Sequence, residues 1–462
     1  MAQRIAGEEA QTHGDGERLG RGDDPQGSGM IMWRGRLRPS DATCANLPWP
    51  RATRHSPTAP TDTDLQPGTP LLSPSAWLMT LLLGLPCALL LLAPWLCWRF
   101  VRAVPQLREL PYEPLPSWPA VSILVPARDE QHSLREASLS RLALDYPDLQ
   151  LVLVNDRSED DTGAIVDELA AADERVTAVH VTRLPPDWLG KNHALKLASE
   201  AARGEWLLFS DADVHFAPDV LRRALAHAEA RGLDFMTLIP DMWSTGFWQD
   251  CALAAFGRLF TLTQRPWRMQ DPQSEAAMGV GAFNLVRRSA LDASEGLQWL
   301  AYDVVDDVAL ARLLKRSGAR CAAVSGRGLA GLRWYDSLPA MVRGLEKNTF
   351  ASCGCSLPRL LFYATLVLWM ELSPFAALFA PVPAWLPWLA GAGLLVGGGC
   401  SAVMARFMGR PVLPSLLTPV GTLLMAYTLA RAGWLGWRRG GVVWRDTFYP
   451  SEKLRQRARV RF

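Results

Sequence analysis

The predicted fold is organised around the stretch Gly204-Glu205-Trp206-Leu207-Leu208-Phe209-Ser210-Asp211-Ala212-Asp213-Val214. Its apolar run, Trp206 to Phe209, predicts a buried strand of a parallel sheet. Asp211 and Asp213 follow one residue apart, and side chains at that spacing point to the same side of an extended chain. They would lie at the carboxyl end of the strand, where open α/β sheets bind ligands. The alternative is an ordinary surface turn, in which Asp is common.

Strands and helices alternate on the N-terminal side of this stretch. The expected strands are 121–125, ending at Pro126, then 149–154 and 176–181, and the expected helices are 130–142, 162–172 and 191–202. Elements of these lengths in alternation predict a parallel sheet with right-handed crossovers. We therefore expect a soluble domain over residues 119–356 of the α/β class, with a mostly parallel sheet and helices on both faces.

An apolar segment without a charge, residues 76–98, precedes this domain. Since ~20 apolar residues cross a bilayer, the segment predicts a transmembrane helix. Arg99, Arg102 and Arg108 follow it, whereas residues 55–75 contain no Lys or Arg. The positive-inside rule then predicts a multi-pass protein of the inner or plasma membrane with the 119–356 domain in the cytoplasm.

The regions outside these two elements give less definite predictions. Residues 1–73 are rich in Gly, Pro, Ser and Thr and predict a disordered tail. Residues 360–430 form a membrane region with three apolar segments, 360–380, 384–404 and 412–430. Three crossings would place the basic C-terminal tail, residues 438–462, outside, although its charge favours the inside. One segment is therefore expected to be re-entrant or interfacial, and the sequence leaves open which one.

Composition limits the partners. The formal net charge of +2 argues neither for nor against nucleic acid, and no nucleic-acid partner is expected. The eight cysteines form no C-x-x-C pair and no zinc spacing, which indicates a reduced protein without a structural metal.

Polar residues follow the predicted strands where ligands would bind. Pro126-Ala127-Arg128-Asp129-Glu130 follows the first strand and opens a helix, so its backbone amides are expected to form an anion or nucleotide site. Asp156 ends the second strand, and neighbouring parallel strands end close together. Asp156 can accept from ribose hydroxyls or a base N–H, or it can simply cap the next helix. The carboxylates of Asp211 and Asp213 suit a divalent cation, Mg²⁺ or Mn²⁺, that also holds diphosphate oxygens.

Five ordered segments carry a resemblance to a known family. They are Val125-Pro126-Ala127-Arg128-Asp129-Glu130, Val154-Asn155-Asp156-Arg157-Ser158, Trp188-Leu189-Gly190-Lys191-Asn192-His193-Ala194, Ser210-Asp211-Ala212-Asp213 and Asp306-Asp307. Over roughly residues 76–450 the chain resembles membrane-bound family 2 glycosyltransferases with a GT-A (Rossmann-like) fold. The similarity is greatest to members that glycosylate lipids, such as ceramide glucosyltransferases and bacterial carotenoid or hopanoid-associated transferases.

The resemblance implies a substrate pair and a set of donor-site residues. It implies an inverting transfer from a nucleotide-diphosphate sugar, a UDP-sugar by analogy, to a membrane lipid acceptor. Asp156 would contact the nucleotide, Asp211 and Asp213 would form the D-x-D pair with Asp213 as the metal ligand, and Lys191 would lie near the phosphates. Pro126, Arg128 and Glu130 would complete the nucleotide-sugar site. The alternative for Lys191 is an ordinary lysine at the start of a helix, where a cation is mildly unfavourable.

The same resemblance implies the catalytic base and the acceptor side. Val304-Val305-Asp306-Asp307-Val308-Ala309-Leu310 is similar to the family's Glu-Asp-Val-x-Leu segment, which makes Asp307 the base and Asp306 its neighbour in place of Glu. A like charge and partial burial would raise the pKa of Asp307 toward working pH. Alternatively, the pair only stabilises a helix N-terminus. Gly279 and Gly281 belong to an acceptor-side loop in which glycine allows close backbone approach.

One departure from the family pattern bears on the product. Arg333 and Trp334 preserve the end of the family's (Gln/Arg)-x-x-Arg-Trp motif on the acceptor side, but Ala330 replaces its first, polar residue. This replacement disfavours a processive polysaccharide synthase, the first alternative function. A nucleotidyltransferase and a catalytically inert membrane scaffold are the others. Gly441-Val442-Val443-Trp444-Arg445 also resembles a tail motif of the lipid-directed relatives.

Overall fold

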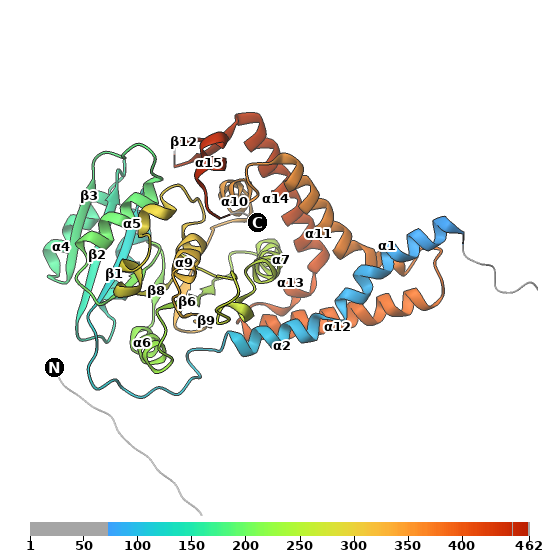
Figure 1. The fold of residues 1–462 in the computed structure, drawn as a ribbon, viewed down its shortest axis with the longest axis horizontal. Helices are drawn as coiled ribbons and strands as arrows, with labels where there is room; N and C mark the ends of the chain where they lie inside the picture. The colour runs from blue at the N-terminus through green and yellow to red at the C-terminus, as the bar shows by residue number, and fades with distance from the viewer. Residues whose placement is uncertain (1–72, 446, 461–462) are drawn as a thin grey trace, which may run out of the picture. The chain divides into compact units, whose positions relative to one another are not determined.

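The computed structural model describes residues 73–445 and 447–460, so the predicted tail of residues 1–73 lies outside it except for Ser73. Its centre is a seven-stranded sheet with the order β3-β2-β1-β4-β8-β6-β9 (Figure 1). The strands are β1 (Val121–Ala127), β2 (Leu149–Asp156), β3 (Val176–Val181), β4 (Trp206–Phe209), β6 (Phe235–Ile239), β8 (Asn284–Arg287) and β9 (Cys321–Ser325). Only β8 runs antiparallel to its neighbours, so the predicted mostly parallel α/β sheet is confirmed.

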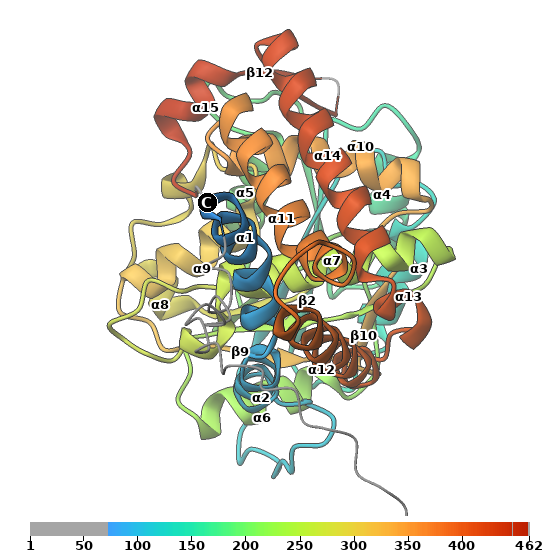
Figure 2. The same ribbon diagram turned by 90° about the vertical axis from the view of Figure 1, so that its right-hand side faces the viewer.

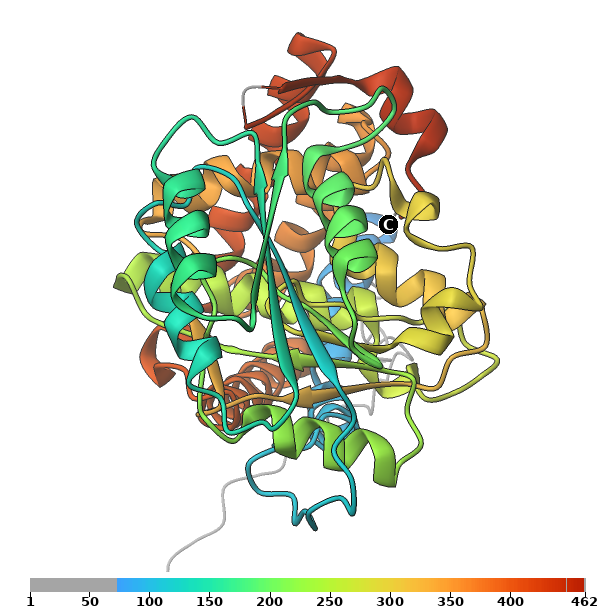
Figure 3. The ribbon, with the colours of Figure 1, turned by 90° about the vertical axis from the view of Figure 1, so that its left-hand side faces the viewer.

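Helices cover both faces of this sheet (Figure 3). The helices are α3 (Leu134–Leu142), α4 (Thr162–Ala172), α5 (Gly190–Ala201), α6 (Val220–Ala230) and α9 (Asp306–Arg316). Alternate residues of each strand point to opposite faces. Ile123 therefore packs in the core with α3, α4 and α6, while Leu124 packs in the core with α5 and α9. Burial on both faces explains why β1, β2 and β4 are nearly continuous apolar runs in the sequence.

Two predicted boundaries are wrong. Strand β1 does not end at Pro126 but continues through it, with Pro126 paired to Val154 of β2. Helix α3 begins at Leu134, four residues later than the predicted helix 130–142.

A second layer lies between the large sheet and the apolar helices (Figure 1). It contains a small sheet of β5 (His215–Phe216), β10 (Ala330–Leu332) and β7 (Asp241–Met242), and the helices α7 (Phe247–Gln264) and α10 (Leu338–Ser352). Helices α7 and α10 both pack against the apolar helix α14 (Thr418–Arg439). This layer therefore connects the sheet with the membrane region.

Three helical segments among the described residues are long and apolar enough to cross a membrane. They are residues 74–103, made of α1 (Pro74–Leu90) and α2 (Ala93–Ala103), then α11 (Leu357–Ala377) and α12 (Trp385–Phe407). The predicted segment 412–430 is divided between α13 (Val412–Leu416) and α14, and neither is among the three. Helix α14 runs beside α11 (Figure 2). Its Gly421 and Gly436 pack tightly on Cys251 of α7 and Phe350 of α10.

The C-terminal residues return to the α/β domain. A hairpin of β11 (Gly441–Trp444) and β12 (Thr447–Pro450) leads into α15 (Ser451–Arg457). Beyond α15, Asp303 Oδ1 accepts hydrogen bonds from the backbone N–H groups of Arg459 (2.8 Å) and Val460 (2.9 Å). Figure 3 shows this end of the chain, in red, descending toward the yellow segment that precedes α9.

Candidate functional site

A cleft of about 820 Å³ opens at the carboxyl ends of β1, β2 and β4. The C-terminal hairpin and the segment after β10 form its far wall. Most of the site residues expected from the sequence line it: Pro126, Arg128, Glu130, Asp156, Lys191, Asp211, Asp213, Arg333 and Trp334. Residues separated by more than 200 positions are thus brought together at the edge where α/β sheets bind ligands.

Hydrogen bonds with β1, with Gly281 and with α3 fix the turn that carries the D-x-D residues. Ser210 N–H donates to the carbonyl of Leu124 in β1 (3.1 Å), and Asp211 N–H donates to the carbonyl of Gly281 (2.9 Å). The buried guanidinium of Arg141 in α3 donates to the Asp211 carbonyl (2.5 Å) and to Ser210 Oγ (3.2 Å). These contacts fix the backbone, so that the carboxylates of Asp211 and Asp213 face the cleft.

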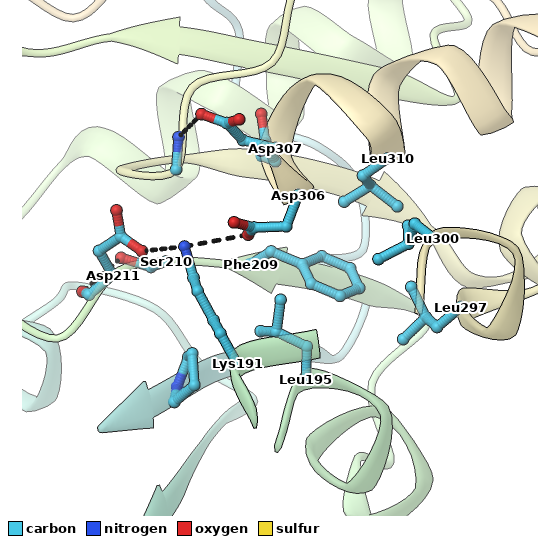
Figure 4. A pocket seen from close by; sticks show the side chains of 13 residues that line it. Lys191, Leu195, Phe209, Ser210, Asp211, Leu297, Leu300, Asp306, Asp307 and Leu310 are labelled. Atoms are coloured by element: carbon cyan, nitrogen blue, oxygen red, sulfur yellow. Dashed lines mark hydrogen bonds and ion pairs between the residues drawn. The ribbon is translucent and has the colours of Figure 1, made fainter. Parts of the chain in front are cut away.

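Lys191 connects the two acidic segments (Figure 4). Its Nζ lies 2.7 Å from Asp211 Oδ1 and 2.9 Å from Asp306 Oδ2. Burial opposes the charge of Lys191, but the carboxylates of Asp211 and Asp306 outweigh it and raise the pKa of the lysine. Burial likewise opposes the charge of Asp211, yet Lys191 holds the pKa of that carboxyl below its usual value. Lys191 is therefore a bridging cation rather than a solvated lysine at a helix start.

Asp306 and Asp307 occupy the first turn of α9 but do not line the open cleft. They line a small adjoining pocket of about 10 Å³, together with Lys191 and Gly281 (Figure 4). Asp307 Oδ2 accepts from the Gly281 N–H (3.0 Å) and Oδ1 accepts from the Val308 N–H (2.8 Å). Burial, and then the charge of Asp306, raise the pKa of Asp307 to about 7. A pocket of this size admits about one water molecule.

Both acceptor-side glycines lie where a side chain has no room. A Cβ at Gly279 would be 1.9 Å from the carbonyl oxygen of Asp307, and one at Gly281 would be 2.5 Å from Asp211 Oδ2. The close backbone approach expected from the sequence is therefore present. The two glycines bring the D-x-D turn and the first turn of α9 together, while their contact with an acceptor stays a prediction.

Backbone amides at the end of the segment 126–130, which the sequence predicts to bind an anion, already have acceptors within the protein. The N–H groups of Asp129, Glu130 and Gln131 donate to side chains of the loop before α4. Their acceptors are Ser158 Oγ (3.1 Å), Thr162 Oγ1 (2.8 Å) and Asp160 Oδ2 (3.1 Å). Because these amides are already satisfied and α3 starts only at Leu134, the segment offers side chains to a ligand rather than a helix N-terminus.

Asp156 is buried and pairs with the next residue in the chain. Arg157 Nε lies 2.8 Å from Asp156 Oδ1, and its Nη2 lies 3.2 Å from Oδ2. The helix-cap alternative does not apply, because α4 begins at Thr162 with Asp161 at its N-cap position. Arg157 has a φ of 56°, in the left-handed region that is unusual for a non-glycine residue.

Several cleft residues were not assigned to the site from the sequence. They are Arg157, Trp243, Tyr335, Lys347, Trp444, Arg445 and Tyr449. Burial lowers the pKa of Lys347, on α10, to about 8, and its Nζ lies 4.2 Å from the centre of the Trp444 ring. The tail motif Gly441–Arg445 was the available signal for Trp444 and Arg445. Lys347 gives no such signal, because a lysine on an amphipathic helix is usually solvated.

The carboxylates fit a divalent cation only with help from a ligand. Within residues 73–445 and 447–460, no group of three or more His, Cys, Asp or Glu side chains could hold an ion. Asp211 and Asp213 supply two hard oxygen donors at one edge of the cleft. Mg²⁺ and Mn²⁺ sites of this kind use one or two carboxylates and take their other oxygens from substrate phosphates and water. The donor set therefore fits an ion that arrives with a phosphorylated substrate.

Comparison with known proteins agrees with the family suggested by the sequence. Residues 122–294 match the model of Glycosyl transferase family 2. The chain is 22% identical over 256 residues to 4,4'-diaponeurosporenoate glycosyltransferase of Staphylococcus haemolyticus, covering 54% of this chain and 66% of that protein. It is 28% identical over 202 residues to beta-monoglucosyldiacylglycerol synthase of Trichormus variabilis, covering 42% of this chain and 41% of that protein.

Among solved structures, the chain is similar to the mannosyltransferase PcManGT from Pyrobaculum calidifontis in complex with GDP-Man and Mn²⁺. Identity is 20%, with a TM-score of 0.44, over 75% of this chain and 97% of that one. The chain matches less than two thirds of the length of the two sequence relatives. The resemblance to family 2 is confirmed by the match of the family model.

Proposed function

We propose that the chain transfers a sugar from a nucleotide-diphosphate sugar to a membrane lipid, with inversion at the anomeric carbon, and the match of residues 122–294 to Glycosyl transferase family 2 supports this proposal. One observation carries the proposal: Lys191 joins the D-x-D residue Asp211 to Asp306, next to the proposed base Asp307. Donor binding and proton removal need neighbouring but separate groups, and this arrangement provides both.

The cleft suits the donor in size and in charge. Its volume of about 820 Å³ lies within the range of about 300–1,000 Å³ usual for small-molecule sites. Asp156 would accept hydrogen bonds from the nucleoside, and Pro126, Arg128 and Glu130 would flank it. UDP-sugars are the first donors to test, on the resemblance alone.

Asp211 and Asp213 would hold a Mg²⁺ or Mn²⁺ ion together with the diphosphate oxygens. When bound, such an ion neutralises negative charge on the departing nucleoside diphosphate. Burial, and then the charges of Asp211 and Glu130, raise the pKa of Asp213 to about 7, so a cation at this position would stabilise the charged carboxylate. That crowding of negative charge supports the assignment.

Lys191 and Asp307 would perform the remaining steps. Lys191 is neutralised by Asp211 and Asp306, and an arriving diphosphate offers it a further anionic partner. We expect Lys191 to turn toward the phosphates, which opens the small pocket in front of Asp307. Asp307 then takes the proton of the acceptor hydroxyl while its oxygen bonds to the anomeric carbon and the bond to the diphosphate breaks.

Aromatic residues beside the cleft support a lipid acceptor. Trp243, Trp334 and Tyr335 line the cleft, and the nearby Trp248 at the start of α7 is 57% exposed. Amphipathic aromatic side chains of this kind are enriched at membrane interfaces. Two relatives are named for a diaponeurosporenoate and for a glucosyldiacylglycerol, which supports the same class of acceptor.

The position of the C-terminus supports a specific topology. Arg445 pairs with Glu130, and Asp303 binds the backbone of Arg459 and Val460, so the C-terminal segment lies on the same side of the membrane as the α/β domain. The chain between them must cross an even number of times. Crossings by α11 and α12, with α14 at the interface, satisfy this condition. The arginines after the first span support our proposal that the domain and the C-terminus lie in the cytoplasm.

Lipid-dependent release of nucleoside diphosphate tests the proposal. The full-length protein in lipid nanodiscs would be incubated with Mn²⁺ and a panel of UDP- and GDP-sugars, with and without a bacterial lipid extract. The proposal expects release that needs both a sugar nucleotide and the extract, and that is lost in Asp213→Ala. Release that does not depend on added lipid would contradict a lipid acceptor.

A further inference from the structure

The C-terminal hairpin forms a wall of the donor cleft, although the apolar helices separate it from the α/β domain in sequence. Trp444, Arg445 and Tyr449 of this hairpin line the same cleft as Lys191 and Asp211. The hairpin is fixed at both ends, by α14 before it and by the contacts of Arg459 and Val460 with Asp303 after it. Its side chains are therefore held in position rather than presented on a free tail.

Lys347 of α10 faces the hairpin without a direct ion pair, although the carboxylates of Asp306, Asp211 and Asp307 attract it at longer range. Its Nζ donates to Asn348 Oδ1 (2.7 Å) and lies 4.2 Å from the centre of the Trp444 ring. No carboxylate in residues 73–445 and 447–460 forms an ion pair with it, whereas Lys191 has two. Keeping an ammonium group partly out of water without an anion costs free energy, so this arrangement suits a site that receives an anionic ligand.

The neighbouring residue fixes the rotation of α10 that directs Lys347 into the cleft. Glu346 pairs with two arginines of α14, with Arg431 Nη1 at 2.5 Å and Arg439 Nη1 at 2.7 Å. Adjacent residues of a helix point about 100° apart. With Glu346 held against α14, the side chain of Lys347 turns toward Trp444 and the cleft.

Arg445 has a weak partner and a strained backbone. Its Nη2 lies 2.6 Å from Glu130 Oε1, but the two side chains are 39% and 25% exposed, and an ion pair so open to water contributes little. Its φ is 45°, in the left-handed region. Strain of this kind persists where the surrounding structure enforces it, and it gathers at ligand sites.

We propose that Lys347 and Arg445 form a second cationic site that binds the diphosphate of the donor across the cleft from Lys191. The inference rests on the proposed function. When the donor binds, Arg445 leaves Glu130 and pairs with phosphate oxygens, and Lys347 forms a direct ion pair with the diphosphate. Guanidinium and ammonium groups are the side chains that make strong charge-assisted hydrogen bonds to phosphate. The membrane-proximal C-terminus thereby becomes part of the donor site.

Comparing nucleoside monophosphates with diphosphates isolates this contact. Calorimetry on the full-length protein in nanodiscs with Mn²⁺ would give Kd for UMP, UDP, GMP and GDP. Lys347→Gln and Arg445→Gln should each weaken diphosphate binding by about tenfold to a hundredfold, the range for losing a hydrogen bond to a charged group. Monophosphate binding should stay unchanged, which also shows that each variant is folded. Lys347→Arg, which keeps the cation, should retain more of the diphosphate preference.

Matched controls come from the same elements. Arg343→Gln on α10 and Arg438→Gln at the end of α14 remove exposed arginines outside the cleft and should leave every Kd unchanged. A diphosphate-to-monophosphate ratio that is unaltered in both cleft variants would overturn the inference alone, and the anion at this site would then come from the acceptor. Equal losses of diphosphate and monophosphate affinity, which leave this ratio unchanged, would also overturn the inference. A wild-type protein that binds neither UDP nor GDP would overturn the proposed donor site itself.

Discussion

Replacing Asp307 by Asn tests the role of the proposed base. The amide cannot take the acceptor's proton, and general-base catalysis is worth about 10²–10⁴-fold, so turnover should fall by that factor. Donor binding should be nearly unchanged, because Asp307 lines the small pocket and not the open cleft. Asp306→Asn should lose less turnover, because the carboxylate of Asp306 is already paired with Lys191.

The hydrogen bonds of Asp307 also determine how much Asp307→Asn lowers the free energy of unfolding. Asp307 accepts from two backbone N–H groups, those of Gly281 and Val308, one on each carboxylate oxygen. An amide has a single acceptor oxygen, so one N–H loses its partner at a cost of about 1–3 kcal/mol. Removing a negative charge beside Asp306 offsets part of this cost. The variant should therefore fold, with a modest fall in its thermal midpoint.

The assay combines turnover with donor binding and pH. Turnover is followed as sugar transfer to extractable lipid, and donor binding by calorimetry with UDP or GDP. The raised pKa of Asp307, about 7, means that the base is protonated below neutrality. The kcat/KM of the wild type should therefore rise with pH through about 7 and then level off, and Asp307→Asn should lose this rise. If the variant loses donor binding and turnover together, Asp307 is a nucleotide or metal ligand. If Asp306→Asn is the less active variant, the assignment within the pair is reversed.

Three further predictions follow from the same geometry. Asp213→Ala should abolish Mn²⁺-dependent binding of nucleoside diphosphate and leave the fold intact, and calorimetry matching the parent would exclude Asp213 as a metal ligand. Because the native cysteines of residues 119–356 are buried and residues 438–462 have none, the topology is tested with single cysteines introduced at exposed positions of both segments. These cysteines should be protected from an impermeant reagent in intact cells and react after lysis, and labelling of either segment in intact cells would refute the topology. Gly279→Ala should destabilise the protein by about 1–3 kcal/mol, because its Cβ would meet the Asp307 backbone, whereas Gly257→Ala, with open space around it, should not.

Much of the sheet is predictable from local sequence because its strands are buried on both faces. The runs 121–125, 149–154, 176–181 and 206–209 are short and mostly apolar, the first three contain several β-branched residues, and each run forms a strand within two residues of its predicted limits. The antiparallel strand β8 is only four residues long and has no such run to announce it. The late start of α3 also escapes prediction, because side chains of another loop satisfy the amides before it.

The acidic residues at the strand ends are predictable from the sequence, whereas the cationic residues Lys347 and Arg445 are not. Asp211, Asp213 and Asp156 follow predicted strands, so topology alone brings them to one edge. The second cationic wall depends on tertiary contacts that no local pattern reveals. Lys347 faces the cleft because its neighbour is paired to α14, and Arg445 reaches it because the tail folds back. The same fold-back is the basis for the proposed even number of crossings in the C-terminal half, a question that hydropathy and charge left open.

Sugar transfer to a membrane lipid is best tested by following the sugar itself. Purified protein in nanodiscs would receive a radiolabelled sugar nucleotide, Mn²⁺ and a lipid extract, and the label would be separated into organic, aqueous and insoluble fractions. We expect label in the organic phase for the wild type and almost none for Asp307→Asn. Label in an insoluble polymer would instead indicate a polysaccharide synthase, and label that stays in the aqueous phase with every donor would contradict transfer to lipid.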